Sequence, residues 1–313
     1  MVTAKEGEPP VPTASTLVRQ GYPASLFKTE LRNGFTMPLR IPTSSATRPV
    51  SFLAFLAPWR LMASDWSRLV GVTELMELPS ADPGELARTL EDLAWINRWL
   101  GGTRLLHSHL ESLFTNLPSP IQILDVATGY ADVPRAIARW GRRRGLPIRI
   151  EAIDSHAQIL EQARQASQGY PEIHIRQGDA LNLPYPDGSF DVVLASLILH
   201  HTEGEAQARL LRELYRVARV AVVVNDLRRG RWPFLVTWMS LRLVSRSRVI
   251  HHDGPVSVRR GFLAGELLAL AREAGWRQAR VCRHAFFRLA LIGEKMKPQT
   301  PSATAGYPAN ERG

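Results

Sequence analysis

The chain has 313 residues, 45% of them hydrophobic, which favours one catalytic domain with extensions and a substantial buried core. It contains no continuous apolar run long enough to span a bilayer, and its single cysteine, Cys282, excludes an intramolecular disulfide and a cysteine-based metal cluster. These features predict a cytoplasmic protein with no membrane span.

The formal net charge of +10 raises the question of a nucleic-acid partner, because clustered Lys and Arg side chains neutralise phosphates. The arginines are instead scattered through predicted helices. The densest run, Arg142–Arg144, lies at a helix end, where cations interact favourably with the helix dipole. We therefore expect no nucleic-acid partner, and the sequence leaves the oligomeric state open.

The first part of the chain carries little sign of regular structure. Residues 1–61 are rich in Pro, Ser and Thr and show no sustained hydrophobic period, which predicts disorder. Met62 precedes the first organised sequence, so an alternative is that translation begins there and the upstream stretch is not part of the native protein. Residues 297–313 are again rich in Pro, Ser and Ala and predict a flexible tail.

Two amphipathic helices are predicted within residues 62–117. Asp82 as N-cap, Pro83 at the first helical position and Glu85 two residues later predict the start of one helix, which Gly101 and Gly102 end. A second helix is predicted over residues 105–114.

Residues 121–132 are the most informative stretch of the chain. Alternating apolar residues over 121–126 predict a buried strand, and Ala127 and Gly129 leave room for the backbone to approach a ligand closely. A helix is predicted to begin at Asp132. Because Asp125 and Asp132 occupy the ends of a turn where a phosphate would need positive surroundings, we expect a cationic ligand.

The second predicted strand, 149–153, closes on Asp154. A carboxylate at this position can accept hydrogen bonds from both hydroxyls of a ribose, because it offers two oxygens and no competing donor. Ser155 and Gln158 form an S-x-x-Q pattern that predicts a capping box for the next helix. The alternative is that Asp154 only caps that helix.

Three further strands are predicted. Residues 172–177 form the third, followed by Asp179 and Ala180, and residues 192–195 form the fourth, followed by Ser196. Residues 220–224 form the fifth.

Two histidines, His200 and His201, follow the fourth strand. Thr202 and Glu205 then predict a second capping box, at the start of a helix. Alternating strands and helices with short connections imply a mostly parallel sheet covered on both faces, with ligands bound beyond the carboxyl ends of its strands.

This order of motifs resembles the class I, Rossmann-like S-adenosylmethionine-dependent methyltransferases, in particular small-molecule enzymes related to the ubiquinone and menaquinone C-methyltransferases. The resemblance rests on the loop after the first strand, on Asp154 and Asp179, and on the approach to the fourth strand over residues 181–191. The chain departs from the family motif by carrying Ala127 and Ala131 at two glycine positions.

The resemblance implies an α/β fold with a seven-stranded, mostly parallel sheet, a C-terminal antiparallel pair and added N-terminal helices. It implies a helical lid over 62–117 and a methyltransferase domain over 118–296, with a cofactor core over 118–226 and an acceptor-site insertion over 227–260. After the fifth strand we expect a helix, a loop, a second helix and the two closing strands, in the order 232–244, 251–255, 262–274, 278–284 and 286–293.

The implied cofactor is S-adenosylmethionine. The resemblance places Asp179 by the adenine amino group and Ser196 toward the cofactor. The full set of predicted cofactor-binding residues is Asp125, Ala127, Thr128, Gly129, Asp132, Asp154, Ser155, Asp179, Ala180 and Ser196.

The predicted reaction is methyl transfer to oxygen or carbon of a hydrophobic small molecule that is aromatic, quinol-like or polyketide-derived. The aromatic residues that motivate an apolar acceptor are Trp95, Trp99, Trp232, Phe234 and Trp238. Trp95 and Trp99, with Asn97 and Arg98, are expected to line the acceptor pocket. The alternative is that this helix packs on the domain and buries its two tryptophans.

His200 and His201 are the candidate catalytic bases, because histidine accepts a proton near neutral pH. The alternative is that one of them only shapes the pocket through a backbone hydrogen bond. We expect no metal site, since the adjacent His251 and His252 with Asp253 lack a further obvious ligand. A methyltransferase acting on RNA or protein, and a noncatalytic cofactor-binding module, stay open as other functions.

Overall fold

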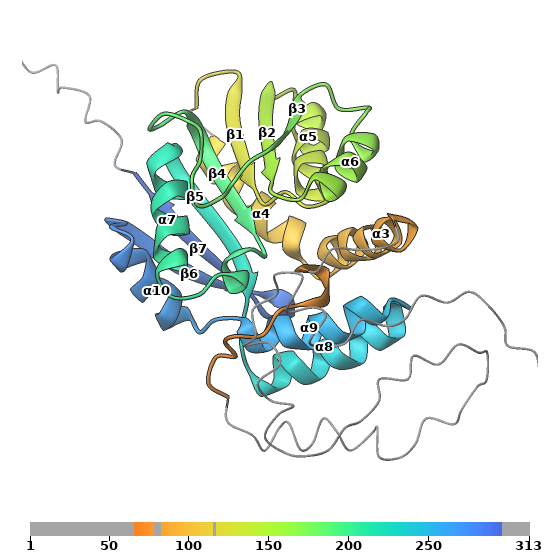
Figure 1. The fold of residues 1–313 in the computed structure, drawn as a ribbon. Coiled ribbons are helices and arrows are strands. Elements are labelled where there is room, and N and C mark those ends of the chain that lie inside the picture. Colours follow the sequence, from red (N-terminus) through yellow and green to blue (C-terminus); the bar gives the residue numbers. More distant parts are fainter. Residues whose placement is uncertain (1–65, 78–82, 115–116, 296–313) are drawn as a thin grey trace, which may run out of the picture. The chain divides into compact units, whose positions relative to one another are not determined.

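The computed structural model describes residues 66–77, 83–114 and 117–295. They contain one seven-stranded sheet with the order β3-β2-β1-β4-β5-β7-β6 (Figure 1). The strands are β1 (Ile121–Val126), β2 (Ile148–Asp154), β3 (Ile173–Gln177), β4 (Phe190–Ser196), β5 (Ala218–Leu227), β6 (Gln278–His284) and β7 (Arg288–Glu294). The first five strands run parallel, and β7 is antiparallel to both β5 and β6. The predicted sheet is confirmed.

Alternation along the strands divides the core between the two faces of the sheet. Ile123 and Leu194 face a cluster that includes α4 (Gly102–Phe114) and α5 (Asp132–Arg144). Their neighbours Leu124 and Val193 face a second cluster that includes α7 (Glu205–Val217) and α10 (Ala264–Glu273). Because every second side chain of a strand points to the same face, apolar residues on both faces require helices on both faces. α6 (Ala157–Ala166) packs against β2 and β3.

Three helices lie outside these two layers. They are α3 (Pro83–Trp99), at the right of Figure 1, and α8 (Arg231–Val244) and α9 (Arg248–Arg260), which lie below it. The short helix η2 (Leu75–Glu77) is tied to α9, because the backbone N–H groups of Leu75 and Met76 donate to the two carboxylate oxygens of Asp253 at 2.9 Å each.

Both predicted capping boxes are wrong. α6 begins after His156 with no side-chain cap, and α7 begins after Gly204 with none. The Thr202 hydroxyl donates instead to the Leu199 carbonyl at 2.8 Å, within the short helix η3 (Leu199–His201). The predicted N-cap Asp82, like the extension over 1–61 and the tail over 297–313, lies outside the described residues.

The predicted loop over residues 251–255 is also wrong, because these residues lie inside α9. Pro255 falls at the eighth position of that helix. A Cβ atom at Gly254 would come within 2.0 Å of Leu241 Cδ1 on α8, so glycine allows α8 and α9 to approach closely without a shift of that side chain. Tertiary contacts of this segment, among them the bonds from η2 to Asp253, thus override the local turn preference of the Gly-Pro pair.

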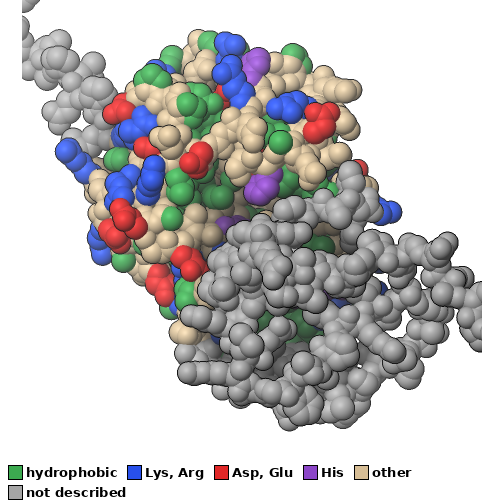
Figure 2. All heavy atoms as spheres, in the orientation of Figure 1, with side chains coloured by type: hydrophobic (Ala, Val, Ile, Leu, Met, Phe, Trp, Pro, Cys, Tyr) green, Lys and Arg blue, Asp and Glu red, His purple; other side chains and the backbone are tan. Residues whose placement is uncertain are grey.

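No helix in the described part of the chain is long and apolar enough to cross a membrane. On the face drawn in Figure 2, basic and acidic side chains are interspersed, and no single basic field dominates that face.

Candidate functional site

The loop between β1 and α5 has an unusual backbone. Ala127, Gly129 and Ala131 all adopt positive φ angles, of 57°, 53° and 54°. L-residues other than glycine pay a steric cost in this region, and such strain is typical of functional sites. A Cβ atom added at Gly129 would meet nothing within 4 Å, so the space above this residue is open.

Asp154 ties the loop to the end of β2. Its Oδ2 accepts a hydrogen bond from the backbone N–H of Gly129 at 2.9 Å, and its Oδ1 accepts one from the N–H of His156 at 3.0 Å. Each carboxylate oxygen has a second lone pair, so the side chain can still accept two hydroxyl groups. The carboxylate therefore holds the loop and stays available to a ligand, and its role toward a ribose stays a prediction.

Asp125 and Thr128 leave polar atoms without partners. The Oδ1 atom of Asp125 and the Oγ1 atom of Thr128 are buried and have no hydrogen-bond partner among the described residues. Burial raises the pKa of Asp125 to about 7 against the opposing effect of the neighbouring Thr128 side chain, and the nearby charges of Asp132 and Asp154 add to this rise. A buried carboxylate oxygen without a partner is costly, and a cationic ligand would stabilise it. This observation fits the ammonium and sulfonium groups of S-adenosylmethionine.

Asp132 is held by the cap helix. The side-chain amide of Asn97 on α3 donates to Asp132 Oδ2 at 2.8 Å, so α3 reaches the first turn of α5. Burial raises the pKa of Asp132 as well. Asn97 also lines the cavity described next, and its predicted role toward an acceptor stays a prediction.

One cavity of about 480 Å³ collects the predicted site. All ten predicted cofactor-binding residues line it, and so do both predicted catalytic histidines. They converge because the carboxyl ends of parallel strands meet at one edge of a sheet. Part of the apolar wall comes from three helices and comprises Leu90, Leu93 and Ile96 of α3, Leu100 just after α3, Leu241 of α8, and Ile250 and Val258 of α9.

The aromatic residues that suggested an apolar acceptor do not line this cavity. Trp95 and Trp99 are 48% and 61% exposed, so both the pocket-lining and the buried interpretation of these tryptophans are wrong. Trp95 and Arg98 border a second, smaller pocket. Trp232 is exposed, and the buried Phe234 packs edge-on against Trp66. Aliphatic side chains supply the apolar surface instead.

His200 and His201 are each oriented by a carboxylate. The Nδ1 atom of His200 lies 2.8 Å from Asp226 Oδ1, and the Nδ1 atom of His201 lies 2.5 Å from Glu77 Oε1. Burial alone would raise the pKa of Glu77, but hydrogen bonds from His201 and Arg260 lower it to about 2. Charge and hydrogen bonding from His200 likewise lower the pKa of Asp226 against the effect of its burial. The alternative that one of these histidines makes only a backbone hydrogen bond is wrong, because the rings of both contact carboxylates.

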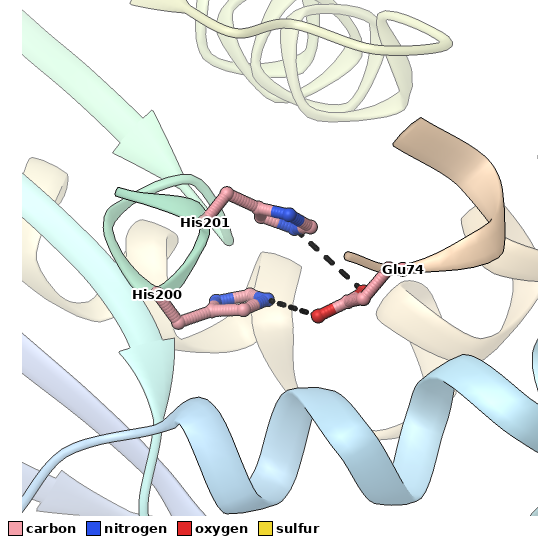
Figure 3. Close-up of side chains that lie close together, drawn as sticks. All are labelled: Glu74, His200 and His201. Carbon is pink, nitrogen blue, oxygen red and sulfur yellow. Dashed lines mark ion pairs between the residues drawn. The ribbon is translucent and has the colours of Figure 1, made fainter. Parts of the chain in front are cut away.

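Glu74 faces both histidines from the segment before η2 (Figure 3). Its carboxylate oxygens lie 3.8 Å from His200 Nε2 and 4.0 Å from His201 Nε2. On α9, the Ser257 hydroxyl donates to Glu74 at 2.8 Å and Arg260 Nη1 lies 3.4 Å away. Burial raises the pKa of Glu74.

Sequence reasoning missed three residues of this cavity region. Glu74 carries no local motif, and only the fold brings it to the histidines. Asp226 ends β5 and could have been found as a further acid at a strand end. Arg288 lines the cavity from β7, 4% exposed, and its Nη1 has no hydrogen-bond partner among the described residues. Burial lowers the pKa of Arg288 to about 10, and the arginine stays a cation at neutral pH.

Comparison with known proteins agrees with this geometry. A model of the methyltransferase domain family matches residues 124–222. The demethylmenaquinone methyltransferase of Deinococcus radiodurans is 38% identical over 32% of this chain and 39% of its own length. The 2-phytyl-1,4-naphtoquinone methyltransferase of Thermosynechococcus vestitus is 36% identical over 32% of this chain and 43% of its own length. The chain thus spans about two fifths of the length of these curated relatives.

A solved structure shares the fold. A putative S-adenosyl-L-methionine-dependent methyltransferase from Methanococcus maripaludis matches with a TM-score of 0.50 and 13% identity, over 71% of this chain and 99% of that one. The match of residues 124–222 to the methyltransferase domain family and the strand order together show that the chain contains a domain with the class I, Rossmann-like fold of S-adenosylmethionine-dependent methyltransferases.

Proposed function

We propose that this protein transfers a methyl group from S-adenosylmethionine to oxygen or carbon of a hydrophobic small molecule of aromatic, quinol-like or polyketide-derived type. The observation that carries the proposal is the single cavity in which acidic strand ends meet an aliphatic wall from α3, α8 and α9. The names of the two menaquinone-type and naphthoquinone-type relatives support an acceptor with an aromatic ring.

The donor end of the cavity is assigned by charge. S-adenosylmethionine, when bound, supplies a methyl group on a cationic sulfonium. In this proposal Asp154 accepts hydrogen bonds from the ribose hydroxyls. The positive charge of the ligand pairs with the buried carboxylate of Asp125. Arg288 offers its unpartnered Nη1 to the carboxylate of the same ligand.

The transfer is a displacement in which the sulfur–methyl bond breaks as a bond from the acceptor to the methyl carbon forms. The sulfonium leaves as a neutral thioether, and the acceptor loses one proton. His201 is the candidate to take that proton at Nε2, since it is partly exposed to the cavity and Glu77 holds its Nδ1. His200 is buried and more constrained. The aliphatic wall excludes water and helps to position the acceptor.

The proposal is tested by calorimetric titration with S-adenosylmethionine and, in parallel, NAD. We expect binding of the former and none of the latter. Loaded protein is then incubated with naphthoquinols and phenols, and mass spectrometry follows the product heavier by one methylene. Tight NAD binding, or turnover of hydrophilic acceptors alone, would contradict the proposal, and turnover of RNA or protein would favour a macromolecular acceptor.

Asp154→Asn tests the donor end. Replacing one carboxylate oxygen by an amide removes an acceptor, so we expect donor affinity to fall at least tenfold, about 1.4 kcal/mol, while acceptor turnover at saturating donor falls less. Asp187→Asn, on an exposed carboxylate outside the cavity, is the matched control. Unchanged donor affinity in a folded Asp154→Asn variant would remove the ribose assignment.

A further inference from the structure

Glu74, His200 and His201 form a compact cluster of three different ligand groups at the cavity wall. One ligand atom from each, a carboxylate oxygen or a ring nitrogen, can be chosen so that all three lie within 4.8 Å of one another. Figure 3 shows the two imidazole rings on η3 and the carboxylate on the facing segment. The cluster is assembled from two stretches of chain that are far apart in sequence.

The two histidines are already oriented as ligands. A carboxylate can only accept a hydrogen bond from an imidazole, so Asp226 and Glu77 fix the proton of each neutral ring on Nδ1. The lone pair of each ring then lies on Nε2, the atom nearer to Glu74. In metal sites, a ligating histidine commonly donates its other N–H to a carboxylate in this way.

The distances within the cluster suit an ion better than direct hydrogen bonds. Separations of 3.8 Å and 4.0 Å between Glu74 and the Nε2 atoms exceed hydrogen-bond length. Ligand atoms about 2.1 Å from a tetrahedral zinc ion lie roughly 3.4 Å apart. The two Glu74–imidazole distances would have to shorten by roughly half an ångström, and the widest separation among the three ligand atoms, at most 4.8 Å, by at most about 1.4 Å.

The surrounding charges leave room for a cation. Arg260 is the nearest cation, 3.4 Å from Glu74 and 2.8 Å from Glu77, and it is shared between these two carboxylates. Asp226 adds a third carboxylate beside His200, and Asp253 lies near Glu74. The other cations facing the cluster are Arg68, which donates to the carbonyl oxygens of His200 and Thr202, and the buried Arg288 near Asp226.

The geometry points to a site for one divalent transition-metal ion of the zinc class, bound by Glu74, His200 and His201. Two imidazoles and one carboxylate suit zinc and its neighbours and do not suit magnesium or calcium. Three protein ligands leave at least one coordination position open, and the three residues all line the cavity. The sequence alone predicts no metal site, because Glu74 lies far from His200 and His201 in the chain and only the adjacent residues His251, His252 and Asp253 suggest one.

The ion would deepen the proposed function, on which its catalytic role rests: an acceptor oxygen at the open position would become more acidic and would release its proton to solvent water, so that proton transfer to His201 would not be needed. Metal binding itself requires neither donor nor acceptor. The site can therefore be tested separately from methyl transfer.

The test uses the full chain, freed of metal with a chelator. Calorimetric titration with zinc chloride is expected to give one ion per chain, and cobalt(II) chloride is expected to develop the visible absorption of a low-symmetry, nitrogen-coordinated ion. Glu74→Gln and His201→Gln should each weaken zinc binding at least tenfold. Glu77→Gln, which removes the negative charge that orients His201 and also pairs with Arg260, should weaken it about 10–100-fold. His174→Gln, outside the cavity, should leave it unchanged.

Thermal melting of each metal-free variant guards against misfolding, and only variants that melt cooperatively are compared. Absence of zinc binding by the wild type, or binding that survives both ligand substitutions, overturns the metal site. If donor binding persists in that case, the proposed methyl transfer is untouched. If zinc binds but no donor does, the metal site stands and the proposed function fails.

Discussion

In the folded protein, the surroundings of Asp125 disfavour the ionised form of its side chain. The side chain is 2% exposed, one of its oxygens has no partner among the described residues, and burial raises its pKa to about 7. The energetic cost of such a carboxylate is a reason to expect a charged ligand beside it.

The raised pKa of Asp125 predicts a pH-dependent stability. Because the pKa in the folded state lies above the ordinary value of 3.8, the folded protein binds the proton more tightly than the unfolded chain. Its contribution is full below that ordinary pKa and is lost as the pH rises through about 7. Between pH 5 and pH 8 we expect the free energy of unfolding to fall by about 2–3 kcal/mol from this residue.

The measurement is urea unfolding of the wild type and Asp125→Asn at both pH values. The variant should lack this part of the decline, so the difference between the two proteins should change with pH. A parallel pH dependence in the two proteins would show that Asp125 has an ordinary pKa in the folded state.

At the scale of elements, the strands and several helix ends could be predicted, among them the start of α5 at Asp132 and the end of α4 at Phe114, whereas the side-chain caps of α6 and α7 could not. Apolar runs in parallel strands are set by burial on both faces, which a sequence displays directly. The two predicted capping boxes are wrong because α6 starts one residue after His156 and α7 one residue after Gly204. Neither helix has a side-chain cap, although polar side chains lie nearby. The tract at 251–255 failed because Asp253 is bound by η2, a contact invisible in local sequence.

The loop between β1 and α5 predicts a stabilising substitution. Ala127 has a φ of 57°, where an alanine costs roughly 1–2 kcal/mol more than a glycine. We expect Ala127→Gly to raise the free energy of unfolding by up to about 1 kcal/mol. The gain is smaller than the strain relieved, because glycine has more conformational entropy than alanine in the unfolded chain. Thermal and urea unfolding measure the change.

The matched control for this substitution is Ala269→Gly, at an exposed position inside α10. There the residue is helical, and glycine should destabilise the protein by about 1 kcal/mol. Equal destabilisation by both substitutions would mean that the backbone at Ala127 is not strained.

At the scale of the whole molecule, the strand-end side of the cavity was predictable and the helical wall was not. The ten predicted cofactor-binding residues lie at or just beyond the carboxyl ends of the parallel strands β1 to β4, so topology brings them together. The aliphatic wall comes from three helices whose mutual placement depends on packing. The tryptophans were misassigned because composition cannot tell which side of a helix faces a cavity. Glu74 reaches the histidines only through the fold.

The aliphatic wall predicts a selective effect on the acceptor. Leu93 on α3 lines the cavity and packs against the cluster of Ile96, Leu241 and Ile250. Leu93→Phe should narrow this end, and we expect the acceptor KM to rise about tenfold while the donor Kd stays within twofold, because overpacking costs about 1–3 kcal/mol. Steady-state kinetics and calorimetry give the two values.

Leu243→Phe is the matched control, since Leu243 lies on α8 at 86% exposure and should change neither constant. An equal effect of Leu93→Phe on donor and acceptor would mean that the helices do not form a separate acceptor end.

The bond from Asn97 on α3 to Asp132 on α5 is one of the contacts that join the helical wall of the cavity to its strand-end side. Apart from that junction, strand termini and cap helices are encoded in different stretches of the chain. Because of this division, changes in the cap helices can alter which acceptor is bound while the strand termini that bind the methyl donor stay the same.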